Sequence, residues 1–402
     1  YRGAGRPEAA YIIERLVDIP AREMKMTPDA LRRLNFPTPE EMPHTMGLGA
    51  VIDSGDFAGA MDAAMDGADW AGFEARRAEA AKAGKVRGIG MATYIERCGG
   101  GGMSPAHIKF EDDDSITMLM GAMDSGQGHA TAYTQILSER LGVDVEKIRM
   151  KQGDTDSTPP GFTGGSKSIP VGGASLSYAS DKVIAKGREL AAHILETAAA
   201  DIEFGDAIFT VAGTDRTIDL FELAKVAKDP ARLPEGMEPG LDAEHDHTAE
   251  AATFPNGCHI AEVEVDPDTG ETTIVNFTVV DDFGVALNPM LLEGQVHGGI
   301  AQGIGQAMTE HTAYDEDGQL LSGSFMDYQM PRADDFPPIS FSTRNVPCTT
   351  NLLGVKGAGE AGAIGAPPAF INAVVDAIHA KSGAVHVDMP ATREKVWRAL
   401  GG

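Results

Sequence analysis

Cysteine is scarce in this chain of 402 residues. Its three cysteines, Cys98, Cys258 and Cys348, lie far apart and form neither a CxxC pair nor an even framework for disulfides. This usage is typical of a reducing compartment, so we expect a cytoplasmic protein. An iron–sulfur cluster needs about four cysteine ligands, so these scattered residues cannot hold one.

Positive charge is also low. Lys and Arg number 33 against 60 Asp and Glu, which gives a net charge of −27. Phosphate binding needs clustered cations, so we expect no nucleic-acid partner. The sequence has no run of about 18 apolar residues, and we therefore expect no transmembrane helix and no membrane insertion.

Several catalytic and metal signatures are missing. The sequence contains neither G-x-S-x-G nor H-E-x-x-H, so serine-hydrolase and zinc-protease chemistry have no support. His245 and His247 flank Asp246, but no third ligand stands at helical or turn spacing. We interpret this stretch as an acidic surface loop rather than as a metal site.

Apolar periodicity and turn signals predict a mixed organisation. Helices and strands follow one another without regular βαβ alternation, which indicates an α+β fold with mixed sheets and packed helices. The clearest element is a hairpin of two alternating runs between His259 and Val280. From residue 85 the sequence changes to short β-like runs and glycine turns, which predicts a boundary between domains 1–84 and 85–402. Helices are expected over 8–35 (its first stretch ending before Pro20), 56–83, 130–142, 168–200, 288–310, 366–381 and from Pro390, strands at 106–110, 115–122 and 385–387, and an irregular acidic surface excursion over 205–253.

One acid stands alone in a run of glycine and alanine near the C-terminus. Lys356 precedes residues 357–362, in which Glu360 is the single ionisable residue. Small neighbours let the backbone approach a large ligand closely. A carboxylate in such a tight, partly dry pocket has a raised pKa, which suits a general base near neutral pH. The alternative is a helix entry at which Glu360 only interacts with the positive end of the helix dipole.

The same run formally satisfies the dinucleotide-binding pattern GxGxxG, and Asp388 follows 26 residues later. Residues 350–356, however, do not form an apolar strand, and Pro367 and Pro368 fall early in the next helix. Only 14 residues follow Asp388, too few to complete a doubly wound sheet. We therefore disfavour a Rossmann fold.

Two glycine turns stand before predicted helices, where backbone amides can bind an anion. In residues 126–131, Gln127 and Thr131 add side-chain hydrogen bonds, although an ordinary strand–helix turn is the alternative. In residues 161–168, glycines, hydroxyls and Lys167 favour a phosphate. Ser166 replaces the second glycine of a P-loop, so nucleotide hydrolysis is not expected.

The predicted helix 288–310 is unusually rich in glycine. Each glycine in a helix interior costs about 1 kcal/mol relative to alanine, so we expect close approach of another backbone or a broad ligand. Helix-on-helix packing would explain the glycines but not Gln295 and Gln302 beside them. The glycines are Gly294, Gly298, Gly299, Gly303 and Gly305.

These segments together resemble the molybdenum hydroxylases, the family of xanthine dehydrogenase, aldehyde oxidoreductase and aerobic carbon monoxide dehydrogenase. The resemblance covers, in family order, residues 1–8, 126–131, 161–168, 259–335 and 351–362. It implies the C-terminal half of a molybdopterin-binding large subunit. Residues 1–84 would be the tail of the first molybdenum-cofactor-binding domain, and residues 85–402 would be the second such domain.

The resemblance also implies roles for single residues. Glu360 would be the catalytic base toward a hydroxyl or water at the molybdenum, which pterin sulfurs would hold without a direct protein ligand. Gly3 stands where carbon monoxide dehydrogenase has a copper-binding cysteine, and Ala4 where xanthine-type enzymes have a stacking phenylalanine. The substrate pocket would be lined by Tyr1, Arg2, Gly3 and Ala4. The cofactor would be bound by Gly126, Gln127, Gly128, His129, Thr131, Gly165, Ser166, Lys167 (an arginine in the family), Ser168, Gln295, Lys356, Gly357 and Gly359.

The implied reaction is oxidative hydroxylation of an aldehyde or N-heteroaromatic carbon with water. The implied cofactor is Mo-molybdopterin cytosine dinucleotide. Electrons would leave through a 2Fe-2S small subunit and an FAD medium subunit. The N-terminal half of the large subunit would be a separate or cleaved chain, and the complex a dimer of heteromers. Two alternatives stay open: a carbon monoxide dehydrogenase-like enzyme without the copper cysteine, and a non-catalytic pterin- or nucleotide-binding homologue or maturation factor.

Overall fold

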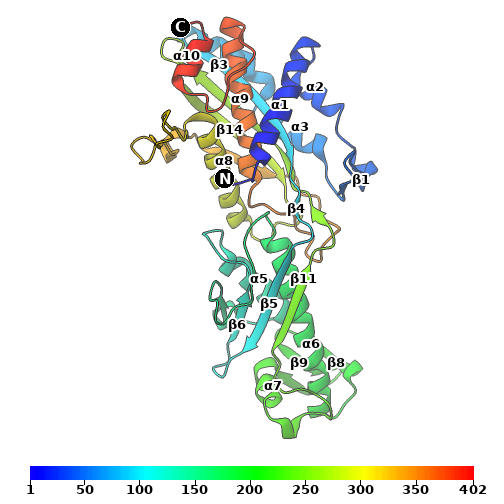
Figure 1. Ribbon diagram of the computed structural model, residues 1–402. Helices are drawn as coiled ribbons and strands as arrows, with labels where there is room; N and C mark the ends of the chain where they lie inside the picture. The colour runs from blue at the N-terminus through cyan, green and yellow to red at the C-terminus, as the bar shows by residue number, and fades with distance from the viewer. The chain divides into compact units, whose positions relative to one another are not determined.

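The computed structural model describes residues 1–402 and divides them into two compact units (Figure 1). Unit 1 comprises residues 1–98, 253–349 and 356–402, and unit 2 comprises residues 99–252 and 350–355. Each unit combines helices with sheets, which confirms the predicted α+β class. The domain boundary near residue 85 stays a prediction, because these units are assembled from separate stretches of chain.

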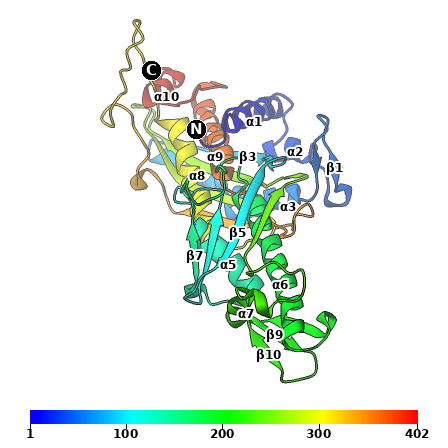
Figure 2. The same ribbon diagram turned by 60° about the horizontal axis from the view of Figure 1, so that its bottom comes forward.

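The main sheet of unit 1 has the strand order β15-β14-β13-β3. Of these strands, β3 is labelled in Figure 2. Its strands are β3 (Val86–Ile95), β13 (Asn256–Val265), β14 (Thr272–Asp282) and β15 (Ile339–Thr343). The antiparallel pair β13–β14 confirms the predicted hairpin, while β15 pairs with β14 in parallel. Alternate side chains serve two cores: Ala261 and Val263 face α8 and α9, whereas Cys258 and Ile260 face α3. The sheet is therefore covered by helices on both faces.

The central helix of unit 1 is α9 (Ala361–Ser382), which begins five residues before its predicted start and includes Pro367 and Pro368. By length and composition alone α9 could cross a membrane, but 94% of its most apolar window is buried inside the protein. Glycines on β3 let it approach the sheet, since a Cβ on Gly90 would stand 2.1 Å from the backbone nitrogen of Ala373. The helix α8 (Pro289–Met308), predicted over 288–310, packs beside it.

The remaining elements of unit 1 correct three predictions. Helix α1 (Arg6–Glu23) runs through Pro20, whose ring fits in the last turn. The helix expected over 56–83 is two separate helices. Asp69, whose φ of 46° lies in the left-handed region, interrupts the helical conformation between them. Residues 385–387 form no strand. The other elements are α2 (Pro28–Arg33), β1 (His44–Thr45), β2 (Val51–Ile52), α3 (Phe57–Gly67), α4 (Phe73–Lys82) and α10 (Arg393–Ala399).

Unit 2 is built on the sheet β11-β5-β6-β7, with a smaller sheet β10-β9-β8. The strands are β5 (Met103–Phe110), β6 (Ile116–Met120), β7 (Ile148–Lys151), β8 (Ile202–Gly205), β9 (Ile208–Val211), β10 (Thr217–Asp219) and β11 (Ala243–Thr248), and β4 (Cys98–Gly99) and β12 (Ala252–Thr253) lie where the chain passes between the units. The helices are α5 (His129–Leu141), α6 (Ala174–Ile194) and α7 (Leu220–Ala227). The helix expected over 168–200 starts with a π-helical turn at residues 168–173, and α6 itself begins at Ala174.

The prediction of an irregular excursion over 205–253 is wrong. These residues form β9, β10, α7 and β11, and β11 pairs with β5 along its whole length. The loop prediction for His245 and His247 fails for the same reason. Both rings lie against Tyr178, at 5.0 and 5.3 Å between centroids. His245 and His247 therefore lie on the face of β11 that packs on the Tyr178 ring of α6, and the residue between them lies on the more exposed face.

Candidate functional site

Glu360 stands immediately before α9, at the position that caps the helix. Its carboxylate does not bond to its own helix but turns to the N-terminal loop. Oε1 accepts the Gly3 N–H at 3.1 Å, and Oε2 lies 3.3 Å from Nη1 of Arg6. The side chain is 15% exposed. A cation and an N–H donor hold this carboxylate, so its surroundings are more polar than the dry pocket expected from the sequence.

Arg2 ties the same loop to two other elements. Its Nε donates to the Gly359 carbonyl at 2.5 Å, and Nη2 donates to the carbonyl and Oε1 of Gln295 at 3.1 and 3.2 Å. Burial lowers the pKa of Arg2, while the charges of Glu360 and Glu96 oppose this shift. The structure therefore brings together Arg2, Gly3, Gln295, Gly359 and Glu360, which the sequence had placed in one site.

Tyr1 extends this cluster toward the end of α8. Its hydroxyl donates to the Gln302 carbonyl at 2.6 Å and lies 3.2 Å from Oε1 of Glu310. Burial, together with the neighbouring carboxylate of Glu310, raises the pKa of Tyr1. Ala4 is exposed and adopts the left-handed conformation, with φ 50°.

The glycines of α8 let the first residues of α9 pack closely against it. A Cβ on Gly299 would stand 2.9 Å from the Cα of Gly362, and one on Gly303 would stand 3.1 Å from the Ala363 carbonyl. This confirms the predicted close approach of another backbone for these two positions. A Cβ on Gly298 would instead stand 3.5 Å from Nη1 of Arg2, and one on Gly294 would meet nothing within 4 Å.

Lys356 and Gly357 support the loop that carries Glu360. The Lys356 ammonium is buried, 2.6 Å from Oδ2 of Asp282 and 3.1 Å from the Ser54 carbonyl. The Gly357 N–H donates to the Thr253 hydroxyl at 3.3 Å. The charge of Lys356 is thus used inside unit 1, and the contact to a cofactor that the resemblance implied for it stays a prediction.

The first glycine turn lies in unit 2 and is organised by Asp124. Its carboxylate accepts the N–H groups of Gly126, Gln127 and His129 at 2.7, 2.9 and 3.0 Å. Burial alone would raise the pKa of Asp124, but these N–H groups and the charge of His129 hold it below its ordinary value. The amides expected to bind an external anion therefore bind this carboxylate. Gln127 folds back in the same way, accepting the Ser125 N–H at 2.6 Å.

Two other residues of this turn keep unused polar groups. His129 is buried, and its Nε2 has no hydrogen-bond partner. Burial lowers the pKa of His129, while Asp124 opposes this shift. Thr131 is exposed on the first turn of α5. Gly126 and Gly128 adopt positive φ, at 104° and 77°.

The second glycine turn of unit 2 also differs from its expected chemistry. Lys167 is buried, its Nζ donates to the Met103 carbonyl at 2.9 Å, and it stands 3.8 Å from the Phe162 ring centroid. Burial lowers its pKa. Its ammonium is therefore occupied within unit 2 rather than offered to a phosphate. Gly165 and Ser166 take left-handed conformations, with φ 60° and 52°, and the Ser168 carbonyl accepts the Tyr133 hydroxyl at 2.8 Å.

Sequence reasoning missed two residues of these clusters, Arg6 and Asp124. Asp124 stands two residues before the glycine turn, and an Asp at this spacing is a signal for a side chain that accepts backbone N–H groups. Arg6 carries no such local signal, because Glu360 is 354 residues away.

Comparison with known proteins identifies the fold. Residues 63–337 and residues 1–36 match two family profiles, each described as a molybdopterin cofactor-binding domain. The chain belongs to the molybdenum hydroxylase family. It is 36% identical to the carbon monoxide dehydrogenase large chain of Hydrogenophaga pseudoflava, over 98% of this chain and 51% of that protein. It is also 36% identical to the nicotine 6-hydroxylase large subunit of Paenarthrobacter nicotinovorans, over 100% of this chain and 51% of that subunit.

Solved structures agree with these relatives. Quinoline 2-oxidoreductase from Pseudomonas putida 86 superposes with a TM-score of 0.93 at 32% identity, covering 100% of this chain and 53% of that chain. The carbon monoxide dehydrogenase of Oligotropha carboxidovorans superposes with a TM-score of 0.91 at 34% identity, covering 98% of this chain and 52% of that one. The chain spans about half the length of the curated relatives it matches.

Proposed function

We propose that this chain is the C-terminal half of the catalytic large subunit of a molybdenum-dependent oxidoreductase. The observation that carries the proposal is Glu360, a lone acid before α9 whose carboxylate is held by Gly3 and Arg6. When bound, the molybdenum cofactor supplies the redox centre that accepts two electrons from the substrate carbon. The reaction replaces a C–H bond with a C–O bond, uses water as the oxygen source, and releases two protons.

The residues fit such a cofactor in part. The buried, unpartnered Nε2 of His129 is an orphan polar atom in a turn assigned to cofactor binding. Cβ atoms built on Gly126 and Gly165 meet nothing within 4 Å, so both turns have open outer faces. Within unit 2 we assign cofactor contacts to these two turns. The amides bound by Asp124 and the ammonium of Lys167 contribute by shaping the turns rather than by direct contact.

Glu360 acts in this proposal as the general base. Its carboxylate takes up one proton as the new C–O bond forms. The Gly3 N–H and Arg6 keep both carboxylate oxygens in place, and Arg2 fixes the carbonyl of Gly359 beside it. A base held in this way needs no reorientation when substrate binds.

We infer an aldehyde or an N-heteroaromatic ring as the substrate rather than carbon monoxide. A side chain at position 3 would stand 2.5 Å from Cδ of Pro7, and Gly3 has φ 110°. The local backbone therefore opposes the cysteine that a copper site would need. The small Ala4 leaves room for an organic substrate, and relatives named for nicotine and quinoline act on N-heteroaromatic compounds by name.

Electrons must leave through other chains in this proposal. The three cysteines are buried and too few for an iron–sulfur cluster, so 2Fe-2S and FAD centres would reside on a small and a medium subunit. The rest of the large subunit would supply the other part of the cofactor site, and the cytosine dinucleotide form of the cofactor and a cytoplasmic dimer of heteromers complete the proposal.

Cofactor analysis of the intact complex tests the proposal. We expect about one molybdenum per copy of this chain, and release of a cytidine nucleotide on acid treatment. A folded complex without molybdenum would instead favour the rival, a non-catalytic homologue or maturation factor.

A further inference from the structure

A buried acid lies behind the loop that holds Glu360. At the end of β3 the chain alternates between buried and exposed residues, with Tyr94 and Glu96 buried and Ile95 and Arg97 exposed. Inward positions of such a stretch are ordinarily apolar. Glu96 is 0% exposed, and burying a carboxylate there is costly unless other charges or hydrogen bonds compensate it. An acid at this inward position therefore needs partners that the fold brings to it.

One partner is Arg6 at the start of α1. Its Nη1 lies 3.9 Å from Oε1 of Glu96 and 3.3 Å from Oε2 of Glu360. Its Nη2 donates to the carbonyl of Arg97 at 3.0 Å, next to Glu96 in the chain. A single guanidinium thus stands between the buried acid and the carboxylate that we assign as the base.

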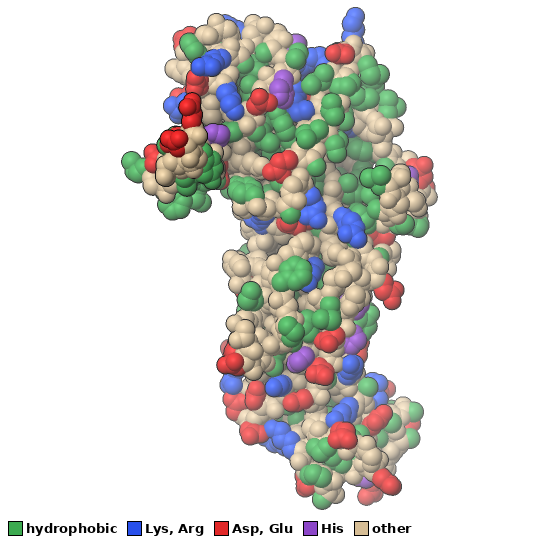
Figure 3. Space-filling model, in the orientation of Figure 1, with side chains coloured by type: hydrophobic (Ala, Val, Ile, Leu, Met, Phe, Trp, Pro, Cys, Tyr) green, Lys and Arg blue, Asp and Glu red, His purple; other side chains and the backbone are tan.

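The charge of Glu96 also acts on the second arginine of this loop. Burial lowers the pKa of Arg2, and the charges of Glu360 and Glu96 oppose this shift. The two carboxylates therefore balance the positive charges of Arg2 and Arg6. Figure 3 shows Lys, Arg, Asp and Glu side chains spread over the surface, where water and salt weaken the interactions between charges. The charge of Glu96 is buried, so it is screened much less than these.

The contact between Arg6 and Glu360 is longer than usual. Charge-assisted contacts of this kind are typically about 2.7–2.9 Å. Nη1 of Arg6 instead lies 3.3 Å from Glu360 and 3.2 Å from the Gly3 carbonyl, and Glu96 attracts the same atom from 3.9 Å. A guanidinium in close contact with a carboxylate favours its charged form and so opposes proton uptake. Because Arg6 is shared, it can hold Glu360 in place without closing on it.

We propose that Glu96 is a positioning residue for the base. Its buried charge holds the guanidinium of Arg6 back from Glu360, so that Glu360 keeps its orientation and its ability to take up a proton. Glu96 acts only through Arg6 and touches no reacting atom. The inference rests on the proposed function in one respect, that Glu360 is the base.

Chemical modification of Glu360 in the intact complex tests this role without knowledge of the substrate. The probe is a water-soluble carbodiimide with glycine methyl ester at pH 6, and peptide mass spectrometry measures the rate at residue 360. A carboxylate held closely by a guanidinium reacts more slowly with the carbodiimide, because its proton uptake is opposed. We expect Glu96→Gln to slow the modification by about threefold or more, as for charges coupled in one network.

Glu262→Gln is the matched control. Glu262 is also a buried acid of unit 1, and it lies 2.9 Å from Arg76 and 3.4 Å from Arg87. It pairs with Ile89, however, in the first half of β3. This variant should leave the modification of Glu360 unchanged. A general loosening of the loop would expose Glu360 and speed its modification, so the direction of the change separates positioning from a merely structural role.

Two further variants test the route through Arg6. Arg6→Met should speed the modification of Glu360, and adding Glu96→Gln to it should cause no further slowing, because Arg6 transmits the effect. Glu96→Asp keeps the charge on a shorter side chain and should slow the modification less than Glu96→Gln does. Where Glu96→Gln does not assemble into the complex, Glu96→Asp decides, and an unchanged rate in it overturns the proposal.

Several outcomes would overturn the role of Glu96. These are an equal or faster modification of Glu360 in Glu96→Gln, and an equal slowing in Glu262→Gln or in the Arg6→Met background. A Glu360 that the carbodiimide modifies in no variant would overturn it as well, because the base must face a pocket open to small molecules. Failure of the proposed function is a separate result, namely a complex without molybdenum or undiminished turnover by Glu360→Gln.

Discussion

Gly299 of α8 lies so close to Gly362 of α9 that a Cβ on Gly299 would stand 2.9 Å from the Gly362 Cα. The opposite contact is tighter still, because a Cβ on Gly362 would stand 2.4 Å from the Val296 carbonyl. Glu360 precedes Gly362 by two residues. The packing of these two helices therefore sets the position of the carboxylate.

Gly299→Ala should lower turnover by moving the start of α9, and should also lower the melting temperature. The methyl group would meet backbone atoms, which cannot swing aside. Gly294→Ala is the control, because its Cβ would meet nothing within 4 Å. That replacement should stabilise α8 by about 0.5–1 kcal/mol, as alanine is the better helix former. Equal melting temperatures and equal turnover for the two variants would contradict this view of the helix contact.

Lys356→Met should destabilise the protein strongly. The ammonium of Lys356 is buried against Asp282, and its removal leaves that carboxylate with neutral donors only. Breaking such a buried pair costs about 3–5 kcal/mol. Lys82→Met, which breaks an exposed pair with Glu79 at 2.7 Å, should cost about 1 kcal/mol or less. Thermal melting of both variants compares them, and a Lys356 variant as stable as the Lys82 variant would show that the pair has no structural role.

Gly3→Cys should not create a copper site. The new side chain would collide with Pro7 at 2.5 Å and would have to adopt φ 110°, so the loop would move and Glu360 would lose its N–H donor. We expect lower turnover and no bound copper, measured by metal analysis after copper reconstitution. Ala4→Cys is the control, since Ala4 is exposed and already holds a side chain at positive φ. Copper binding with carbon monoxide oxidation by Gly3→Cys would refute the argument.

The stability of unit 2 should fall as the pH drops below about 6.5, the ordinary pKa of histidine. Burial lowers the pKa of His129, so the folded protein favours the neutral ring. The contribution of His129 is complete above its unfolded pKa and is lost as the pH falls toward its folded pKa. Melting temperatures at pH 7.5 and 5.5 should differ less for His129→Gln than for the unchanged protein. If His129→Gln had the same pH dependence as the unchanged protein, His129 would not be the source of the loss of stability at low pH.

Sequence patterns predicted the elements whose structure depends on neighbouring residues. The hairpin of β13 and β14 followed from two alternating runs around a turn, and α8 and α9 followed from apolar periodicity. Residues 205–253 were missed because β11 alternates His and acidic residues, and only its pairing with β5 and its contact with Tyr178 explain that pattern.

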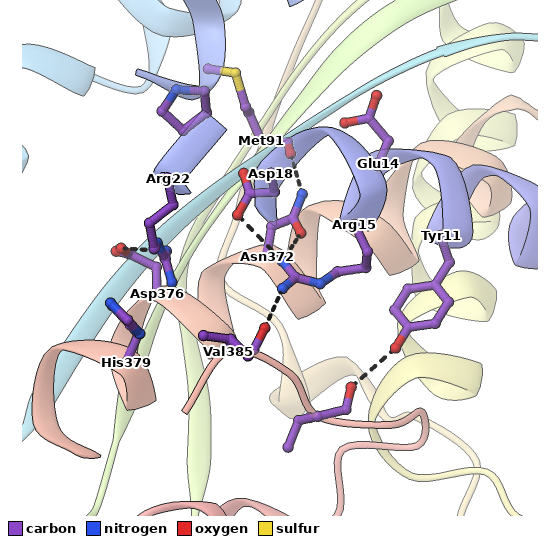
Figure 4. Close-up of polar contacts among 12 residues, drawn as sticks. Tyr11, Glu14, Arg15, Asp18, Arg22, Met91, Asn372, Asp376, His379 and Val385 are labelled. Carbon is purple, nitrogen blue, oxygen red and sulfur yellow. Dashed lines mark hydrogen bonds and ion pairs between the residues drawn. The ribbon is translucent and has the colours of Figure 1, made fainter. Parts of the chain in front are cut away.

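In the candidate site, too, some features could be predicted from the sequence and others depend on tertiary contacts. Glu360, Arg2 and Gln295 were predicted from motifs, and the structure brings them together. The internal use of Lys167 and of the amides around Asp124 could not be predicted, because it depends on burial against the Met103 carbonyl and on the exact fold of a turn. The burial of Arg15 on α1 could not be predicted for a similar reason, since Arg15 reaches its partner Asn372 only in the folded protein (Figure 4).

Replacement of Glu360 tests the central claim most directly. Glu360→Gln keeps the volume of the side chain and its capacity to accept the Gly3 N–H, but it removes the base. Turnover of the intact complex at saturating substrate should fall by about 10²–10⁴-fold, the usual effect of losing a general base, while molybdenum and nucleotide content stay unchanged. A Glu360→Gln complex that contains the full amount of cofactor and turns over at the original rate would contradict the assignment of Glu360 as the catalytic base.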